Sequence, residues 1–122
     1  MNLFAGIDVG SLSTDCVIIN EKEEILSYSI TETGANSTES AEKSFEEALV
    51  RAVVQRDRVK RIVATGYGRI SVPFAGKKVT EISCHALGAC KLFPDTRTVV
   101  DIGGQDSKVI RVGPAARCST SP

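Results

Sequence analysis

The stretch LFAGIDVGS at residues 3–11 begins as an apolar run and ends, from Asp8 onward, in the turn-forming letters DVGS. An apolar run of this length that stops at a glycine is typical of a buried strand followed by a tight turn. The stretch RTVVDIGGQD at residues 97–106 repeats this design, with Asp101 at the end of its apolar run. The sequence therefore predicts two strands that each end in an Asp-x-Gly turn.

The spacing of hydrophobic residues predicts further strands and helices on either side of these two stretches. The predicted strands cover residues 3–9, 14–20, 24–30, 60–65 and 97–102, with a further strand at 106–112. The first three have tight links, so we expect them to form an antiparallel meander.

Helices are expected after the capping residues Asn36 and Thr80, and the second helix should run near residues 81–92. Residues 70–79 contain Pro73 and Gly76 and should be irregular. Because helices return the chain to parallel strands, we predict an α/β fold with a mixed five-stranded sheet in the order β-β-β-α-β-α-β.

The composition favours a soluble globular protein and excludes some kinds of partner. Of the 122 residues, 42% are hydrophobic and 25% are charged, and 15 Lys plus Arg balance 15 Asp plus Glu. A zero net charge argues against a nucleic-acid binder that works by bulk positive charge. No apolar stretch approaches the roughly 20 residues of a membrane span. The first residues lack a signal-peptide pattern, so we expect a cytoplasmic protein with no membrane partner.

The two Asp-x-Gly turns have the residue types of a phosphate-binding site. Glycine lets backbone N–H groups approach phosphate oxygens, and an aspartate offers a hard oxygen to Mg²⁺. Ser11, together with Ser13 or Thr14, can donate hydroxyl hydrogen bonds to phosphate. Either turn alone is compatible with a plain β-turn, whereas two copies after apolar strands are more specific. Neither copy is a Walker A loop or a Rossmann glycine motif.

Four short stretches of the sequence resemble a known ATPase superfamily and one family within it. GIDVGS at 6–11 and DIGG at 101–104 resemble the two phosphate loops of the actin/Hsp70/hexokinase superfamily. ATGYGR at 64–69, EISCHALGA at 81–89 and DIGGQDSKVI at 101–110 resemble the BadF/BadG/BcrA/BcrD ATPase family. That family includes activators of 2-hydroxyacyl-CoA dehydratases and ATP-binding subunits of benzoyl-CoA reductase.

The resemblance implies a ribonuclease H-like, actin-like ATPase domain at residues 1–105. Residues 106–112 would be the first strand of an incomplete second domain, and residues 113–122 a disordered tail. Relatives of this kind hydrolyse ATP and deliver a low-potential electron to an iron–sulfur acyl-CoA dehydratase or reductase. They assemble as homodimers or heteromers around a [4Fe–4S] cluster.

The resemblance also implies roles for the residues that match its motifs. Asp8 and Asp101 would hold Mg²⁺, mostly through water, and Gln105 would orient the attacking water. The nucleotide phosphates would contact the remaining loop residues, which are Gly10, Ser11, Ser13, Gly103 and Gly104.

The chain departs from the family pattern in three respects. Several relatives carry a lysine where this chain has Asp15, and a carboxylate there would repel phosphate unless it faces away or assists Mg²⁺. The adenosine-binding motif of the second domain is absent from the sequence. Cys118 lacks the sequence context of the family's cluster cysteines. A non-catalytic actin-like binding domain and a sugar-kinase-type ATPase domain therefore stay open as alternatives.

Three further features have two interpretations. The Tyr67-Gly68-Arg69 segment is either a loop near the nucleotide or a simple exit from a strand. For His85, the only histidine, and for Cys84, we favour a packing role over a catalytic one.

Overall fold

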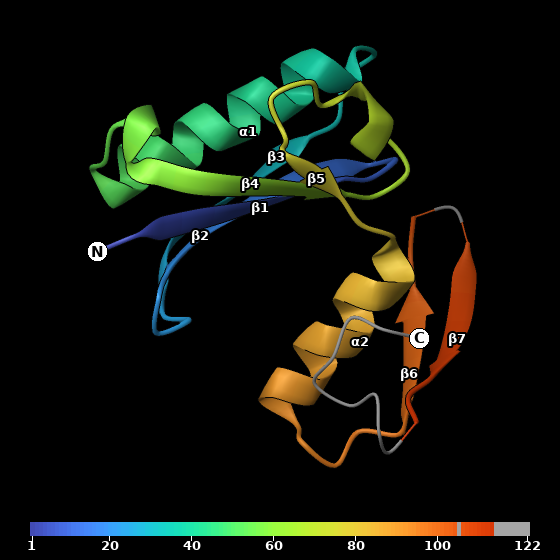
Figure 1. Cartoon of the computed structure of the whole chain (residues 1–122). Coiled ribbons are helices and arrows are strands. Elements are labelled where there is room, and N and C mark those ends of the chain that lie inside the picture. Colours follow the sequence, from blue (N-terminus) through green and yellow to red (C-terminus); the bar gives the residue numbers. More distant parts are fainter. Residues whose placement is uncertain (105, 114–122) are drawn as a thin grey trace. The chain divides into compact units, whose positions relative to one another are not determined.

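The structure is a computed structural model, and it describes residues 1–104 and 106–113 (Figure 1). Its contacts divide the chain into two compact units, the first spanning Met1–Lys78 and the second beginning at Val79. Each unit is described by itself. The domain boundaries predicted from the sequence, at residues 105/106 and 112/113, stay predictions, and residues 114–122 lie outside the described part.

The first unit begins with the predicted antiparallel meander. It consists of β1 (Leu3–Val9), β2 (Ser13–Asn20) and β3 (Ile25–Glu32), with β2 paired to both of the others. The link between β2 and β3 is stabilised by Asn20, whose side-chain oxygen accepts hydrogen bonds from the backbone N–H groups of Lys22 and Glu24. The meander therefore follows from local turn chemistry.

Helix α1 (Ser37–Ala52) covers one face of this sheet (Figure 1). It starts at the predicted cap, because the side chain of Asn36 accepts a hydrogen bond from the N–H of Glu39 at 3.0 Å. Its apolar stripe is buried with alternate residues of β1 and β2. Two strand serines also bind it, since the hydroxyls of Ser27 and Ser29 donate to helix carbonyls at 2.7 and 2.6 Å.

The chain returns parallel to β1 through β4 (Val59–Thr65), after the short 3₁₀ helix η1 (Arg56–Arg58). A second 3₁₀ helix, η2 (Arg69–Ser71), leads to β5 (Lys77–Lys78), which pairs parallel with β4. The sheet order is β3-β2-β1-β4-β5. A mixed five-stranded sheet in an α/β fold is therefore confirmed.

The identity of the fifth strand differs from the prediction. It is β5, within the segment expected to be irregular, where the N–H of Gly76 donates to the carbonyl of Ile62 at 2.9 Å and aligns the chain with β4. Only two residues then pair. So short a strand has no hydrophobic pattern of its own, which explains why the sequence did not reveal it.

The second unit contains α2 (Glu81–Leu92), β6 (Thr98–Ile102) and β7 (Ser107–Arg111). Helix α2 begins after Thr80, as predicted. Among the described residues, β6 pairs antiparallel with β7, and the fifth strand of the mixed sheet is β5 rather than residues 97–102, which corrects the prediction. The short link after β6 favours this hairpin, because the N–H of Gly103 donates to the carbonyl of Asp106 at 2.8 Å.

Candidate functional site

The first predicted phosphate loop is the hairpin turn between β1 and β2. Asp8 is the second-to-last residue of β1, and Ser13 is the first residue of β2. The N–H of Gly10 donates to the carbonyl of Ser13 at 3.0 Å and closes the turn. The structure thus brings Asp8, Gly10, Ser11 and Ser13 together within one hairpin.

Asp8 has polar neighbours on the strands at both sides. It pairs in register with Asp15 of β2 and with Thr65 of β4. Ile7 and Val9 are buried on the face that α1 covers, so alternation places these three polar residues on the opposite face. One side-chain oxygen of Asp15 (Oδ1) and the hydroxyl of Thr65 are buried and have no hydrogen-bond partner. Two unsatisfied oxygens therefore flank Asp8.

The segment after β4 packs directly on the strand that carries Asp8. Gly66 has a φ of 88°, and a Cβ there would lie 2.4 Å from both Asp8 Oδ1 and the carbonyl oxygen of Val9. The N–H of Gly68 donates to that same carbonyl at 3.0 Å. Tyr67 is exposed, whereas Arg69 donates back to the carbonyl of Gly66 at 2.9 Å. The segment thus lies beside Asp8 and also has the glycine geometry of a strand exit.

The second predicted phosphate loop is the hairpin between β6 and β7, in the second unit. Asp101 is the second-to-last residue of β6, and Gly103 and Gly104 follow in an exposed turn. Asp101 pairs across the hairpin with Lys108. Gln105, the predicted water-orienting residue, lies outside the described residues.

Asp101 has a histidine and a lysine as neighbours within its own unit. Its Oδ2 lies 3.3 Å from Nδ1 of His85 on α2 and 3.9 Å from Nζ of Lys108. Lys108 is also 3.8 Å from a carboxylate oxygen of Glu81. The contact between His85 and Asp101 is not a hydrogen bond, and Nδ1 of His85 is buried without a hydrogen-bond partner. His85, for which the sequence favoured packing, therefore faces a predicted metal-binding carboxylate.

A cavity of about 320 Å³ lies beside this pair, between α2 and β6. Its lining residues are Cys84, His85, Gly88, Ala89, Val99, Val100 and Asp101. The cavity therefore gives small molecules or water access to Asp101 from the helix side.

The described cysteines do not form a cluster-binding set. Cys16 is buried, and this burial raises the pKa of its thiol from 9.0 to about 12, so it stays protonated at neutral pH. Cys84 is a free, half-buried thiol. Within residues 1–104 and 106–113, no three His, Cys, Asp or Glu side chains are grouped so that they could hold a metal ion. Cys118 lies outside the described residues.

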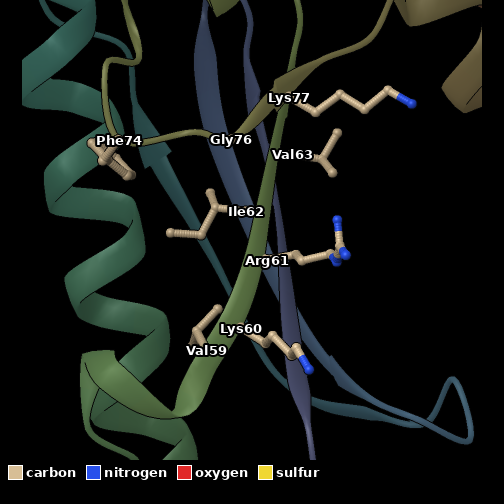
Figure 2. Close-up of a pocket in the computed structure, with 8 residues that line it drawn as sticks. All are labelled: Val59, Lys60, Arg61, Ile62, Val63, Phe74, Gly76 and Lys77. Carbon is tan, nitrogen blue, oxygen red and sulfur yellow. The ribbon is translucent and has the colours of Figure 1, made fainter.

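A second cavity, of about 470 Å³, opens along the outer edge of β4 (Figure 2). Figure 2 shows Val59, Ile62 and Phe74 on the side of α1, and Lys60, Arg61 and Lys77 extending away from it. None of the predicted site residues lines this cavity.

Comparison with protein families matches residues 5–119 to the BadF/BadG/BcrA/BcrD ATPase family. The chain belongs to this family. It is 43% identical over 108 residues to the (R)-2-hydroxyglutaryl-CoA dehydratase activating ATPase of Acidaminococcus fermentans, covering 88% of this chain and 41% of that protein. It is 39% identical over 107 residues to the activator of lactoyl-CoA dehydratase of Anaerotignum propionicum, with the same two coverages.

A solved structure of a family member agrees with the fold. The activator of the 2-hydroxyisocaproyl-CoA dehydratase from Clostridium difficile, with bound ADPNP, superimposes with a TM-score of 0.87 at 35% identity. The match covers 94% of this chain and 42% of that one. The chain thus has the actin-like fold of the BadF/BadG/BcrA/BcrD ATPases and spans about two fifths of the length of the relatives it matches.

In the part of the chain that the structure describes, neither helix combines the length and the apolar character needed to cross a membrane.

Sequence reasoning missed two neighbours of the loop aspartates. Thr65 ends β4 next to Asp8, and Lys108 lies opposite Asp101. Lys108 follows Asp101 by seven residues, as Asp15 follows Asp8, and the structure shows that both pairs meet across their hairpins. Thr65 gave no such signal, since its place depends on the parallel register between β1 and β4.

Proposed function

We propose that this chain supplies the two phosphate loops of an ATPase that activates a 2-hydroxyacyl-CoA dehydratase or a benzoyl-CoA reductase-type enzyme. Membership of the BadF/BadG/BcrA/BcrD ATPase family supports this, as do the activator names of the two curated relatives. The observation that carries the proposal is the repeated hairpin, which places Asp8 and Asp101 at the same position of two glycine turns.

Each loop residue has a role in this proposal. The nucleotide phosphates would contact the backbone N–H groups and hydroxyls of Gly10, Ser11, Ser13, Gly103 and Gly104. Asp8 and Asp101 would hold Mg²⁺ through water, and Gln105 would orient the attacking water. Phosphoryl transfer needs mainly positioning and neutralisation of charge, and these residue types provide both.

The residues beside Asp8 fit a magnesium ion. Mg²⁺ binds carboxylate and other oxygen ligands and usually keeps several waters. The unsatisfied oxygens of Asp15 and Thr65 add two such donors next to Asp8. When bound, the ion would neutralise phosphate charge, which the zero net charge of the chain does not do.

We extend the proposal to the partner and to the coupling. ATP hydrolysis would drive a low-potential electron to an iron–sulfur dehydratase or reductase in the cytoplasm. The assembly would be a homodimer or heteromer that holds a [4Fe–4S] cluster. The described cysteines offer no ligand set for this cluster, so we assign its ligands to none of the described residues.

Phosphate release from ATP by the protein, produced as its gene encodes it, tests the proposal. We expect Asp8→Ala and Asp101→Ala each to lower kcat by about 100-fold or more, because both remove transition-state charge stabilisation. Asp57→Ala is the matched control, since Asp57 is exposed in η1 and outside both loops. Normal rates in Asp8→Ala or Asp101→Ala would show the site assignment to be wrong.

The same assay separates the two alternatives. A non-catalytic binding domain would release no phosphate in the wild type. A sugar kinase would consume ATP only when a sugar acceptor is added, whereas an activator ATPase needs none.

A further inference from the structure

The first half of β4 has an open outer edge. Among the described residues, only Val63 and Ala64 of β4 pair with β5, and the N–H of Gly76 donates to the carbonyl of Ile62 just before them. Residues 59–61 have β1 as the neighbouring strand on one side and no strand of the described sheet on the other. An unpaired edge of this kind presents backbone groups that can hydrogen-bond to a further strand.

The cavity of about 470 Å³ follows this open edge and has an apolar side (Figure 2). On the side of α1 it is lined by Val59, Ile62 and Phe74. Val59 is buried, whereas Ile62 and Phe74 are half-buried and keep apolar surface toward the cavity. This side therefore favours apolar side chains of a ligand, because their contact removes apolar surface from water.

The apolar side is held in place by a stack of side chains. The rings of Phe74 and Phe45 are stacked with their centroids 5.7 Å apart, and the guanidinium carbon of Arg56 lies 4.9 Å from each centroid. Arg56 is itself paired with Glu42 and Glu46, at 2.9 and 3.1 Å. The position of Phe74 is thus fixed before a ligand arrives, which lowers the entropic cost of binding.

The other side of the cavity is cationic. Lys60, Arg61 and Lys77 are exposed and extend away from α1 (Figure 2). In residues 1–104 and 106–113, none of these three side chains belongs to an ion pair, and no acidic residue lines the cavity. Their positive charge is therefore available to attract an anionic partner and to reject a cationic one.

The same charges exclude a second copy of this edge as the occupant. Lysine on a sheet edge is a common means by which proteins prevent edge-to-edge pairing. Two copies joined along this edge would bring Lys60 and Arg61 of both chains close together, and like charges on neighbouring strands are destabilising. The occupant must therefore carry negative charge where this chain carries positive charge.

We propose that the open edge of β4 binds an extended segment of another protein in which apolar residues alternate with acidic ones. Successive side chains of an added strand point to opposite faces of the sheet. The apolar ones then contact Ile62 and Phe74, and the carboxylates lie beside Lys60 and Arg61. Main-chain hydrogen bonds to the edge supply affinity, and the two faces supply specificity. This binding site goes beyond the proposed function, because no phosphate-loop residue lines the cavity.

Fluorescence anisotropy with a short labelled peptide, in which valine alternates with glutamate and both ends are blocked, tests the proposal on the wild-type chain. We expect saturable binding that weakens as salt concentration rises. Three altered peptides should each bind about tenfold or more weakly: one with lysine for glutamate, one with serine for valine, and one with N-methylated backbone amides. They remove the charge complementarity, the apolar contacts and the main-chain hydrogen bonds, respectively.

A charge-reversal variant supplies the matching test on the side of the protein. The double variant Lys60→Glu with Arg61→Glu should prefer the valine–lysine peptide to the valine–glutamate peptide, which reverses the preference of the wild type. Lys22→Glu is the matched control, since Lys22 is exposed in the turn between β2 and β3 and does not line the cavity. The altered peptides test the wild type directly, so the proposal stays testable if the double variant does not fold.

The proposal is overturned if the wild type does not bind the valine–glutamate peptide. Equal binding of the N-methylated peptide would also contradict it, because binding would then rest on charge without strand pairing. Sedimentation of the wild type as a dimer that this peptide dissociates would assign the edge to a second copy instead.

Discussion

Gly66 lies against Asp8 and Val9 in a left-handed conformation that few residues other than glycine adopt easily. We expect Gly66→Ala to lower the free energy of unfolding by about 1–3 kcal/mol, because alanine is strained at this φ and its Cβ would overlap backbone. Urea unfolding measures the change. Gly6→Ala is the matched control, since a Cβ there meets nothing within 4 Å. Equal stability of both variants would contradict the close approach.

Cys16 links stability to alkaline pH, because burial raises the pKa of its thiol from 9.0 to about 12. Below pH 9 the thiol is protonated in both the folded and the unfolded chain. Above pH 9 only the unfolded chain loses this proton, so the folded state loses stability as pH rises toward 12.

We expect the wild type to lose about 1.4 kcal/mol more per pH unit than Cys16→Ala in this range. Urea unfolding at pH 10 and at pH 11 measures the two slopes. Comparison with Cys16→Ala removes the effect of other groups that titrate there, and identical slopes would refute the buried-thiol explanation.

At the scale of single elements, the stability of helix α1 depends on its N-terminal cap. Asn36→Ala removes the acceptor for the N–H of Glu39 and should cost about 1 kcal/mol. Asn36→Asp retains an acceptor oxygen and should keep nearly the full stability. Denaturant unfolding of the three proteins measures this, and a loss in Asn36→Asp as large as that in Asn36→Ala would argue against the cap.

Most elements could be predicted because their causes are local. The meander, α1 and α2 follow from alternation, apolar stripes and the caps Asn36 and Thr80. The pairing of β5 and of β6 could not be predicted, since it depends on which strands meet in space. The hairpin link at Gly103 favours β7 as the partner of β6, and no periodicity shows this.

The candidate site also contains features that the sequence predicts and features that only the structure reveals. The turn positions of Asp8, Gly10, Asp101 and Gly103 could be predicted, because each lies where an apolar run ends at a glycine. The partners of the aspartates depend on register between strands, so Thr65 beside Asp8 came only from the structure. The sequence marked Asp15 as a departure from the family pattern, and only the structure shows that it pairs with Asp8 across the hairpin.

At the scale of the whole molecule, the chain contains both loop hairpins but spans about two fifths of the length of its relatives. Each hairpin belongs to a different compact unit. Because the proposed function assigns nucleotide phosphates to both loops, each loop aspartate should matter for nucleotide binding.

Titration calorimetry of the chain with Mg-ATP tests this central claim most directly. We expect saturable binding of one nucleotide per chain, weakened by about tenfold or more in Asp8→Ala and in Asp101→Ala. Asp57→Ala should bind like the wild type. Absence of binding in the wild type, or binding that is indifferent to both loop aspartates, would contradict the account.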